Sequence, residues 1–391
     1  MPEHIALLLG CGTVGREVAY LLTSDNTFQQ ILVADKDVDR ARQVAAALDG
    51  KGTAVQAHVD DLTTVASLAR RASVMLNATG PFSSNVTPLM QCALEANIPY
   101  ADINDEASVL WDVFNSGELD KAARQRGIPL VVGLGTSPGL TNIWARYLAD
   151  QLDRVETFHI AIAMDPRYRN PIVFQHRFSV HGGYALVFRH GDWQWVPAFS
   201  EEETVEFPAP VGPVRVHLAA HCEPVTLPRF FTDLQQVDMK AGFIDDAVNR
   251  LLHDVIRYGL TATDAIRVGS CEIVPAEFTA AFLSSPAADH LFQHQSLPSR
   301  IARQVQAKGQ YDGRPCTLTL QVVMDTGARA IAMPLAVTAR LLVQGQVPIT
   351  GLLAPEALPA RPFLDVLEHW GVQLHLRREE STNRFTIGSV P

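Results

Sequence analysis

Residues 10–15 read Gly10-Cys11-Gly12-Thr13-Val14-Gly15, between an apolar run and a stretch of helical spacing. A Gly-x-Gly-x-x-Gly loop in this setting is typical of the first turn of a Rossmann fold. The first glycine permits the tight turn, the second lets a pyrophosphate approach the backbone, and the third lets the helix pack on the strand. We therefore predict that a dinucleotide is bound here, at a helix N-terminus, by Gly10, Gly12, Thr13, Val14 and Gly15.

The first 133 residues alternate between short apolar runs and helical patterns. Strands that alternate with helices in this way form parallel βαβ units. We expect strands at residues 4–9, 30–34, 54–59, 74–78, 98–103 and 128–133. Six such strands predict a doubly wound parallel sheet in the order 3-2-1-4-5-6.

The pattern changes after residue 133, where Ser137-Pro138-Gly139 predicts the start of a helix. Longer strand-like runs follow at residues 157–164, 172–181, 214–221, 303–310 and 317–324. The last two flank a turn, Tyr311-Asp312-Gly313-Arg314, whose residues favour a hairpin. The expected fold class is therefore α/β. A Rossmann domain is followed by a second, α+β domain on a mixed, largely antiparallel sheet.

The composition excludes several classes of protein. Of 391 residues, 47% are hydrophobic and 19% are charged, as in a globular protein. The net charge of −10 disfavours nucleic acid and anionic membranes as partners. No apolar run approaches the roughly 20 residues of a membrane span. Five widely spaced cysteines and an N-terminus without a secretory pattern lead us to expect reduced thiols and a cytoplasmic protein.

Asp35 ends the second expected strand, 20 residues after Gly15. A carboxylate at this position accepts a hydrogen bond from a ribose 2′-hydroxyl and repels a 2′-phosphate, which predicts NAD rather than NADP. Lys36, Arg40 and Arg42 argue for NADP, because a nearby cation accommodates the phosphate. Capping of the next helix is an alternative role for Asp35.

Two further strand ends point towards the same cleft, because ligands of open α/β sheets bind beyond the carboxyl ends of the strands. Asp60 follows the third strand, where an adenine edge would lie, although simple solvation is an equal alternative. The fourth strand ends in Asn77-Ala78-Thr79-Gly80-Pro81-Phe82. We predict that the small turn at Thr79, Gly80 and Pro81 contacts the nicotinamide ribose.

The remaining predicted site residues come from the fifth and sixth strands. Alternation places Tyr100 and Asp102 on one face, so Asp102 is our candidate for an acid–base group, with a helix cap as the alternative. Ser137 and Pro138 open a helix whose N-terminus is suited to an anion near the nicotinamide, with a structural elbow as the alternative. The sequence offers no strong metal-ligand motif, so we expect no metal.

These motifs together resemble the saccharopine dehydrogenase-like family, which includes saccharopine reductases, lysine 6-dehydrogenases and carboxynorspermidine dehydrogenases. The resemblance spans nearly the whole chain. It is carried by residues 10–15, 77–82, 100–102, 137–142, 181–183, 207–210, 223–229, 242–243 and 355–371.

The resemblance implies NAD(P)-linked hydride transfer at a C–N bond of a small amino-acid-like substrate, such as the oxidative deamination of lysine 6-dehydrogenases. It also implies a catalytic and dimerising domain at residues 134–349, and a tail at about 350–391 that returns to the first domain, residues 1–133. Arg177 and Arg229 are our candidates for a clamp on the substrate carboxylate, against structural ion pairs. Reductive amination that joins an amine to a keto acid or aldehyde is the first alternative. A dinucleotide-binding protein without catalysis is the second.

Overall fold

The computed structural model describes residues 3–167, 169–292, 300–325, 327–380 and 385–389. Its contacts divide the chain into two compact units. The first consists of Met1–Tyr147 and Gly327–Val366, and the second of Leu148–Thr326 and Leu367–Pro391. The sequence analysis placed the division after residue 133 and the tail from about residue 350 with the first domain. In the structure the chain leaves the first unit, returns to it once, and ends in the second.

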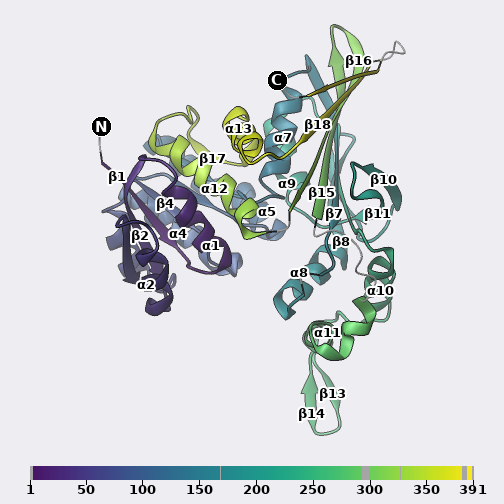
Figure 1. Cartoon of the computed structure of the whole chain (residues 1–391), viewed down its shortest axis with the longest axis horizontal. Coiled ribbons are helices and arrows are strands. Elements are labelled where there is room, and N and C mark those ends of the chain that lie inside the picture. Colours follow the sequence, from purple (N-terminus) through teal and green to yellow (C-terminus); the bar gives the residue numbers. More distant parts are fainter. Residues whose placement is uncertain (1–2, 168, 293–299, 326, 381–384, 390–391) are drawn as a thin grey trace. The chain divides into compact units, whose positions relative to one another are not determined.

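The first unit is built on a seven-stranded parallel sheet (Figure 1). Its strands are β1 His4–Leu9, β2 Phe28–Asp35, β3 Gly52–Gln56, β4 Val74–Asn77, β5 Tyr100–Asp102, β6 Pro129–Val131 and β17 Gly351–Leu353. The order along the sheet is β3-β2-β1-β4-β5-β6-β17, which confirms the predicted doubly wound order. The strand β17, from late in the chain, adds itself beside β6.

Helices bury this sheet. They are α1 Thr13–Leu22, α2 Val38–Ala46, α3 Leu62–Ala69, α4 Phe82–Ala96, α5 Ala107–Ser116, α6 Glu118–Arg126 and α12 Ala328–Val343, with a short 3₁₀ turn at Pro355–Ala357. Helix α1 packs against α12, and α4 packs against α3, α5 and α6. In β1, residues Ala6 to Leu9 are at most 1% exposed, as expected for a parallel strand covered on both faces.

The sequence placed a helix start at Ser137-Pro138, but α7, Leu140–Ala149, begins two residues later. Gly139 has a φ of +126°, which an α-helix does not include. The turn is closed by backbone hydrogen bonds from Gly135 to the Pro138 carbonyl (2.9 Å) and from Leu140 to the Gly135 carbonyl (3.1 Å). The helix therefore starts only after this turn.

The second unit contains a ten-stranded mixed sheet. Its strands are β7 Arg154–Met164, β8 Tyr184–Arg189, β9 Asp192–Pro197, β10 Glu203–Phe207, β11 Gly212–Leu218, β12 Gln236–Phe243, β15 Arg300–Tyr311, β16 Arg314–Asp325, β18 Leu374–Glu380 and β19 Phe385–Ser389. Among the described pairings, β7 with β12 is parallel and the rest are antiparallel, which confirms the predicted mixed sheet. The predicted β15–β16 hairpin turns at Asp312 and Gly313, both with positive φ.

Residues 172–181 were predicted to form a strand, and this prediction is wrong. They lie in a helix, α8, Pro171–His181. Asn170 caps the helix, because its side-chain oxygen accepts a hydrogen bond from the Val173 N–H (2.9 Å). Phe174 and Phe178 stand one helical turn apart and are both buried. Arg177 is buried as well, whereas Gln175 and His176 are exposed, so burial recurs every three to four residues as in a helix and does not alternate as in a strand.

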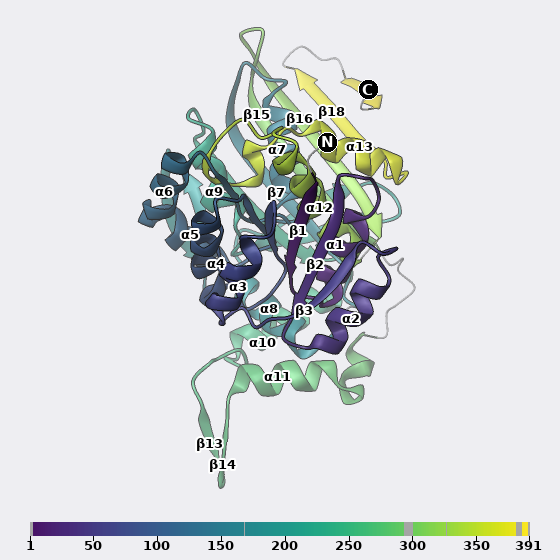
Figure 2. The same cartoon turned by 90° about the vertical axis from the view of Figure 1, so that its left-hand side faces the viewer.

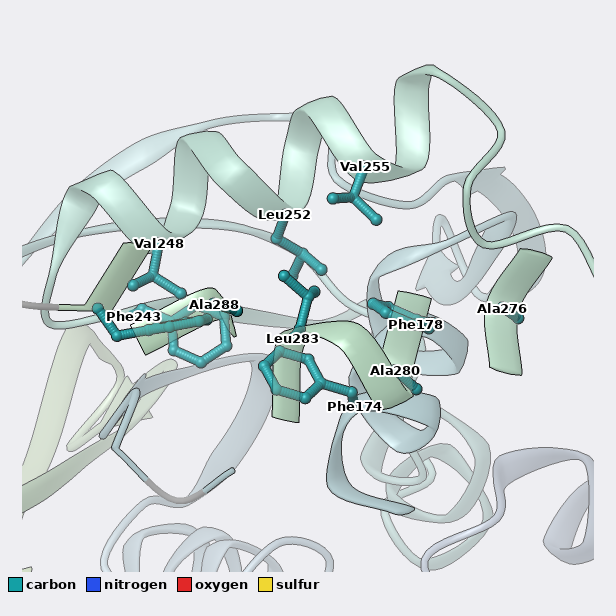
Figure 3. Packing of buried hydrophobic residues seen from close by; sticks show 11 residues of the cluster. Phe174, Phe178, Phe243, Val248, Leu252, Val255, Ala276, Ala280, Leu283 and Ala288 are labelled. Atoms are coloured by element: carbon teal, nitrogen blue, oxygen red, sulfur yellow. The ribbon is translucent and has the colours of Figure 1, made fainter. Parts of the chain in front are cut away.

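An apolar cluster joins α8 to α10 Asp246–Arg257, α11 Pro275–Ser284 and a 3₁₀ turn at Pro286–Phe292. The other helices are α9 Glu223–Phe230 and α13 Arg361–His369, and the sequence boundary between the units falls within α13. Figure 3 shows Phe174 of α8, Leu252 of α10 and Leu283 of α11 pointing towards one another. Beyond α11, Figure 2 shows a small hairpin of β13 Ile266–Val268 and β14 Cys271–Ile273.

Candidate functional site

A cavity of about 430 Å³ lies in the first unit, where β1 to β4 end at their carboxyl edge. Its lining includes seven of the residues that the sequence predicted to bind a dinucleotide. These are Gly10, Gly12, Asp35, Asp60, Thr79, Gly80 and Pro81. The cavity is thus in the position where open α/β sheets bind their ligands.

The glycine loop shapes one wall of the cavity. Gly10 has a φ of +95°, and a Cβ there would lie 2.7 Å from Thr79 Cγ2. A Cβ on Gly15 would lie 2.0 Å from the Gly10 carbonyl oxygen, whereas one on Gly12 would meet nothing within 4 Å. Two of the glycines therefore allow close packing, and Gly12 leaves open space beside the cavity.

The N-terminus of α1 fits the phosphates of a dinucleotide. Gly12 is its N-cap residue, no side chain caps it, and its first turn carries no acidic residue. The first backbone N–H groups and the positive end of the helix dipole therefore remain suited to an anion. Thr13 and Val14 lie in this turn and do not line the cavity, so their contact with the cofactor stays a prediction.

Asp35 is buried at the end of β2, with both carboxylate oxygens hydrogen bonded to backbone. Its Oδ2 accepts from the Cys11 N–H (2.7 Å) and its Oδ1 from the Asp37 N–H (2.9 Å). The cap of α2 is Asp37, whose side chain accepts from Asp39 and Arg40. Asp35 is therefore not the cap of that helix, and it links β2 to the glycine loop.

Cations and a second carboxylate stand beside Asp35. Lys36, Arg40, His58 and Asp60 line the cavity. Arg40 Nη2 lies 3.6 Å from the Asp37 carboxylate and is half exposed, so the guanidinium is loosely held. His58 Nδ1 lies 3.5 Å from Asp60 Oδ2. Groups that favour a ribose hydroxyl and groups that favour a 2′-phosphate therefore occur together.

Asp102 is fully buried and does not line this cavity. Its Oδ1 accepts from the backbone of Asn104 (3.0 Å) and Gly133 (2.9 Å), and its Oδ2 accepts from the Tyr100 hydroxyl (3.0 Å). Burial raises its pKa to about 6, against the lowering effect of these hydrogen bonds. The acid–base role of Asp102 stays a prediction.

Ser137 and Pro138 lie in the turn before α7 and do not line the cavity. Next to them, the Asn142 side chain accepts from the Gly139 N–H (3.0 Å) and donates to Glu356 Oε2 (3.0 Å). Glu356 is fully buried, so this contact ties the start of α7 to the chain segment that returns to the first unit. Binding of the cofactor by Ser137 and Pro138 stays a prediction.

The two predicted clamp arginines belong to the second unit and have different surroundings. Arg177 is buried, donates to the Asp165 carbonyl (3.3 Å) and lies 4.8 Å from the Phe243 ring centroid. Burial lowers its pKa to about 10. Arg229 donates to the Val225 carbonyl (3.0 Å) and lies 4.8 Å from the Trp193 ring centroid. Their joint action on a carboxylate stays a prediction.

A polar group that the sequence analysis missed lies in the same unit. His221 Nδ1 is 2.5 Å from Glu223 Oε2, and the glutamate is fully buried at the start of α9. Burial lowers the pKa of Arg303 to about 10, and the charge of Glu223 opposes this shift. A carboxylate that orients an imidazole is an arrangement used for proton transfer. In the sequence, residues 223–229 stood out only as one of the segments that carry the family resemblance.

Two features are absent from the described residues. No group of three or more His, Cys, Asp or Glu side chains in the described part of the chain is arranged to hold a metal ion. Among the same residues, no helix combines the length and apolar character needed to cross a membrane.

Comparison with known proteins identifies the first unit. Residues 6–131 match the family model described as the saccharopine dehydrogenase NADP binding domain. The chain is 25% identical to carboxyaminopropylagmatine dehydrogenase of Synechocystis, over 94% of this chain and 96% of that protein. Residues 6–131 thus carry a saccharopine dehydrogenase-type NADP binding domain, and the whole chain is similar to saccharopine dehydrogenase-like NAD(P) oxidoreductases. The resemblance predicted from the motifs is thereby confirmed.

Two further matches of this saccharopine dehydrogenase-like chain cover nearly its full length. It is 23% identical to carboxynorspermidine synthase of Vibrio alginolyticus, over 96% of this chain and 97% of that protein. Its fold matches apo saccharopine dehydrogenase (L-Glu forming) from Saccharomyces cerevisiae with a TM-score of 0.70 at 14% identity. That match covers 96% of this chain and 100% of the yeast chain, and it shows a shared fold.

The cavity of the first unit also has lining residues that the motifs did not single out. Ser84 and Asn85 lie in the first turn of α4, and His58 follows β3. All three stand just beyond the carboxyl ends of strands, which is the signal that would have found them. Because they are single polar residues outside any spacing rule, the sequence pattern alone passed over them.

Proposed function

We propose that the chain catalyses NAD(P)-linked hydride transfer at a C–N bond of a substrate that carries an amine and a carboxylate. The cavity of the first unit carries this proposal, because seven predicted cofactor residues from four strand ends line it together. The names of the relatives support the substrate class, since carboxynorspermidine and carboxyaminopropylagmatine both denote carboxylated amines.

The same names bear on the type of reaction. The sequence analysis put oxidative deamination first and reductive amination second. A relative named carboxynorspermidine synthase favours the second type, in which an amine is joined to a carbonyl compound and the resulting C=N bond is reduced. We therefore propose reductive amination of a carboxylated aldehyde or keto acid by an amine, with the reverse oxidation as the assayable back reaction.

The residues of the first unit bind and orient the cofactor. When bound, nicotinamide supplies or takes up the hydride. Gly12 leaves room for the pyrophosphate beside the α1 N-terminus, and Asp35 holds the loop by its bond to the Cys11 N–H. Thr79, Gly80 and Pro81 form the wall proposed for the nicotinamide ribose. Arg177 and Arg229 remain our proposed clamp on the substrate carboxylate.

A panel of substrates tests the proposal. Purified protein is mixed with NADH or NADPH and pairs of amines (lysine, glutamate, diamines, agmatine) with semialdehydes or keto acids, and absorbance of the reduced nicotinamide is followed. Oxidation that requires both partners supports reductive amination. Turnover with lysine and NAD alone would favour oxidative deamination. Tight NADH binding without turnover on any pair would favour the non-catalytic alternative.

The cofactor preference needs its own test. We propose NAD as the better cofactor, because Asp35 stands where a 2′-phosphate would lie. Arg40→Ala should weaken NADPH binding about tenfold and leave NADH binding unchanged, since it removes one charge-assisted hydrogen bond. Arg42→Ala is the matched control, because Arg42 pairs with Asp39 (2.9 Å) and does not line the cavity. Equal or faster initial rates with NADPH would contradict the preference for NAD.

We also propose that the protein works as a cytoplasmic homodimer. Large apolar side chains are exposed near the β13–β14 hairpin, at Tyr258 (71%), Val268 (53%) and Phe278 (58%), which supports a partner surface there. The free cysteines support a reducing compartment. Light scattering after gel filtration measures the mass, and Val268→Asp should shift a dimer towards monomer. A monomeric wild-type protein would contradict the dimer, and recovery in a secreted fraction would contradict the location.

A further inference from the structure

A buried chain of polar side chains runs from β5 to the wall of the cavity, within the first unit. Asn77, Tyr100 and Asp102 are fully buried, and Asn85 is 2% exposed. Thr79 stands at the end of this chain and lines the cavity. Because each group has a defined capacity to donate or accept, the direction of every hydrogen bond along the chain can be worked out.

The backbone determines how the Asn77 amide is turned. The Thr79 N–H can only donate, and it lies 3.0 Å from Asn77 Oδ1. Asn77 Nδ2 therefore faces the other way, where it donates to Asn85 Oδ1 (3.1 Å) and to the Tyr100 hydroxyl oxygen (3.0 Å). Tyr100 passes its own hydrogen to Asp102 Oδ2 (3.0 Å).

At both ends of this hydrogen-bond chain, the terminal groups can act only as donors or only as acceptors. The other oxygen of Asp102 accepts from the Asn104 and Gly133 N–H groups, and above its pKa of about 6 the carboxylate can only accept. At the other end, Asn85 Nδ2 donates to the Pro81 carbonyl (2.8 Å) and the Thr79 carbonyl (3.2 Å). The hydrogens between these ends therefore have one allowed arrangement.

This arrangement leaves the Thr79 hydroxyl only one way to form a further hydrogen bond. Its hydrogen is donated to Asn77 Oδ1 at 2.5 Å. On its other side stands the donor Asn85 Nδ2, at 3.3 Å. Thr79 Oγ1 can therefore only accept any further hydrogen bond, which selects an N–H or O–H group of a ligand over a phosphate oxygen.

We propose that the Thr79 hydroxyl is held as a hydrogen-bond acceptor for a donor group of the bound dinucleotide, a ribose hydroxyl or the nicotinamide carboxamide. Asn77, Asn85 and Tyr100 are its positioning residues, and Tyr100 acts without touching the cavity. The inference rests on the proposed function, because it assigns a direction of recognition to the NAD(P) site.

Titration of three ligands tests the acceptor. Thr79→Val keeps the side-chain volume and removes the hydroxyl, so the NADH Kd should rise about tenfold, while Thr79→Ser should restore wild-type affinity. If the donor is the carboxamide, Thr79→Val leaves binding of ADP-ribose and of acetylpyridine adenine dinucleotide unchanged, since neither carries that N–H. If the donor is a ribose hydroxyl, all three bind more weakly. An unchanged NADH Kd in Thr79→Val overturns the inference, whereas a wild type that binds neither NADH nor NADPH overturns the proposed function.

A double-mutant cycle tests the positioning residues. Tyr100→Phe should raise the NADH Kd several-fold, and Thr79→Val/Tyr100→Phe should bind no more weakly than Thr79→Val alone. Additive effects would overturn the assignment. Ser84→Ala is the matched control, because Ser84 lines the cavity but does not belong to the hydrogen-bond chain. Its effect on the NADH Kd should therefore add to that of Thr79→Val.

Asp102→Asn is the second variant, in case loss of the Tyr100 hydroxyl impairs folding. The oxygen of an asparagine would be taken by the Asn104 and Gly133 N–H groups, so its amide nitrogen would face Tyr100. Tyr100 would then have no acceptor for its hydrogen, and we expect weaker NADH binding. Lower turnover with an unchanged NADH Kd would instead support an acid–base role for Asp102. It would overturn the proposal that a hydrogen-bond chain from Asp102 positions Thr79.

Discussion

The three glycines of the nucleotide loop have different neighbours, although one spacing rule predicted them together. Added Cβ atoms on Gly10 and Gly15 would lie 2.7 Å from Thr79 and 2.0 Å from the Gly10 carbonyl oxygen, respectively. A Cβ on Gly12 would have no neighbour within 4 Å. Gly10 and Gly15 are thus required for packing, and Gly12 keeps space for a ligand.

Gly12→Val should therefore weaken NADH binding by at least about tenfold and leave the Tm nearly unchanged, because the new side chain fills the approach to the α1 N-terminus. Fluorescence titration and thermal denaturation measure the two effects. Gly15→Ala is the contrasting variant, and its clash should lower the free energy of unfolding by about 1–3 kcal/mol. NADH binding of wild-type strength in Gly12→Val would contradict this assignment.

Through Asp102, the free energy of unfolding falls as the pH rises, which is the opposite of the usual effect of a carboxyl group. Burial raises its pKa from 3.8 to about 6, so the folded protein holds this proton more tightly than the unfolded chain does. The folded state therefore loses stability as the pH rises from about 4 to about 6, by an amount on the order of 3 kcal/mol. Carboxyl groups with a lowered pKa, such as Asp238, act in the opposite direction.

Comparison with Asp102→Asn isolates this contribution, because an asparagine does not titrate. We expect the free energy of unfolding of Asp102→Asn, relative to wild type, to increase between pH 4.5 and pH 7.5. Urea denaturation at both pH values gives the two differences. A difference that stays constant with pH would mean that Asp102 keeps an ordinary pKa in the folded protein.

At the scale of elements, α8 shows where local pattern is ambiguous. Its branched and aromatic residues are typical of strands, yet Asn170 and Pro171 form a helix start. The apolar cluster with α10 and α11 buries Phe174 and Phe178, and Arg177 is buried beside Phe178, which fits the period of a helix and not the alternation of a strand. Packing and the cap therefore outweigh the β propensity of the segment.

Asn170→Ala should lower the free energy of unfolding by about 1 kcal/mol, because the Val173 N–H loses its side-chain acceptor. Ser179→Ala, at an exposed position of the same helix, serves as the control and should change stability by less than about 0.5 kcal/mol. Both values come from urea denaturation. Equal effects of the two substitutions would show that the cap contributes little.

At the scale of the whole molecule, the anionic cofactor has to bind to a chain with a net charge of −10. Local features make this feasible, since the α1 N-terminus, Lys36 and Arg40 are all found at the cavity. The cavity belongs wholly to the first unit, which is completed by residues 327–366. Cofactor binding therefore stabilises the folded state of a unit that is discontinuous in sequence.

NADH at a hundred times its Kd should raise the free energy of unfolding by about 2.7 kcal/mol, because it binds the folded state and not the unfolded chain. Differential scanning calorimetry with and without NADH measures this as a shift in Tm. Gly12→Val should show a smaller shift at the same concentration, of about 1.4 kcal/mol or less, because its Kd is at least about ten times higher. An unshifted transition in the wild type would argue against a folded NADH site.

The sequence by itself determined six of the seven strands of the first sheet and the position of its glycine loop. Apolar runs, helical spacing and the glycines at positions 10, 12 and 15 are local properties, and parallel strands align their carboxyl ends. That is why residues as distant as Asp35, Asp60 and Thr79 could be predicted to line one cavity, as they do.

Only the tertiary structure decided how these residues are held and what else joins them. The return of residues 327–366 to the first unit, the hydrogen-bond chain from Asp102 to Thr79, and the His221–Glu223 contact all join groups whose partners are chosen by packing. Burial also set the directions of these bonds, because a buried polar group must use whichever donor or acceptor lies beside it. Sequence spacing carries no record of that choice.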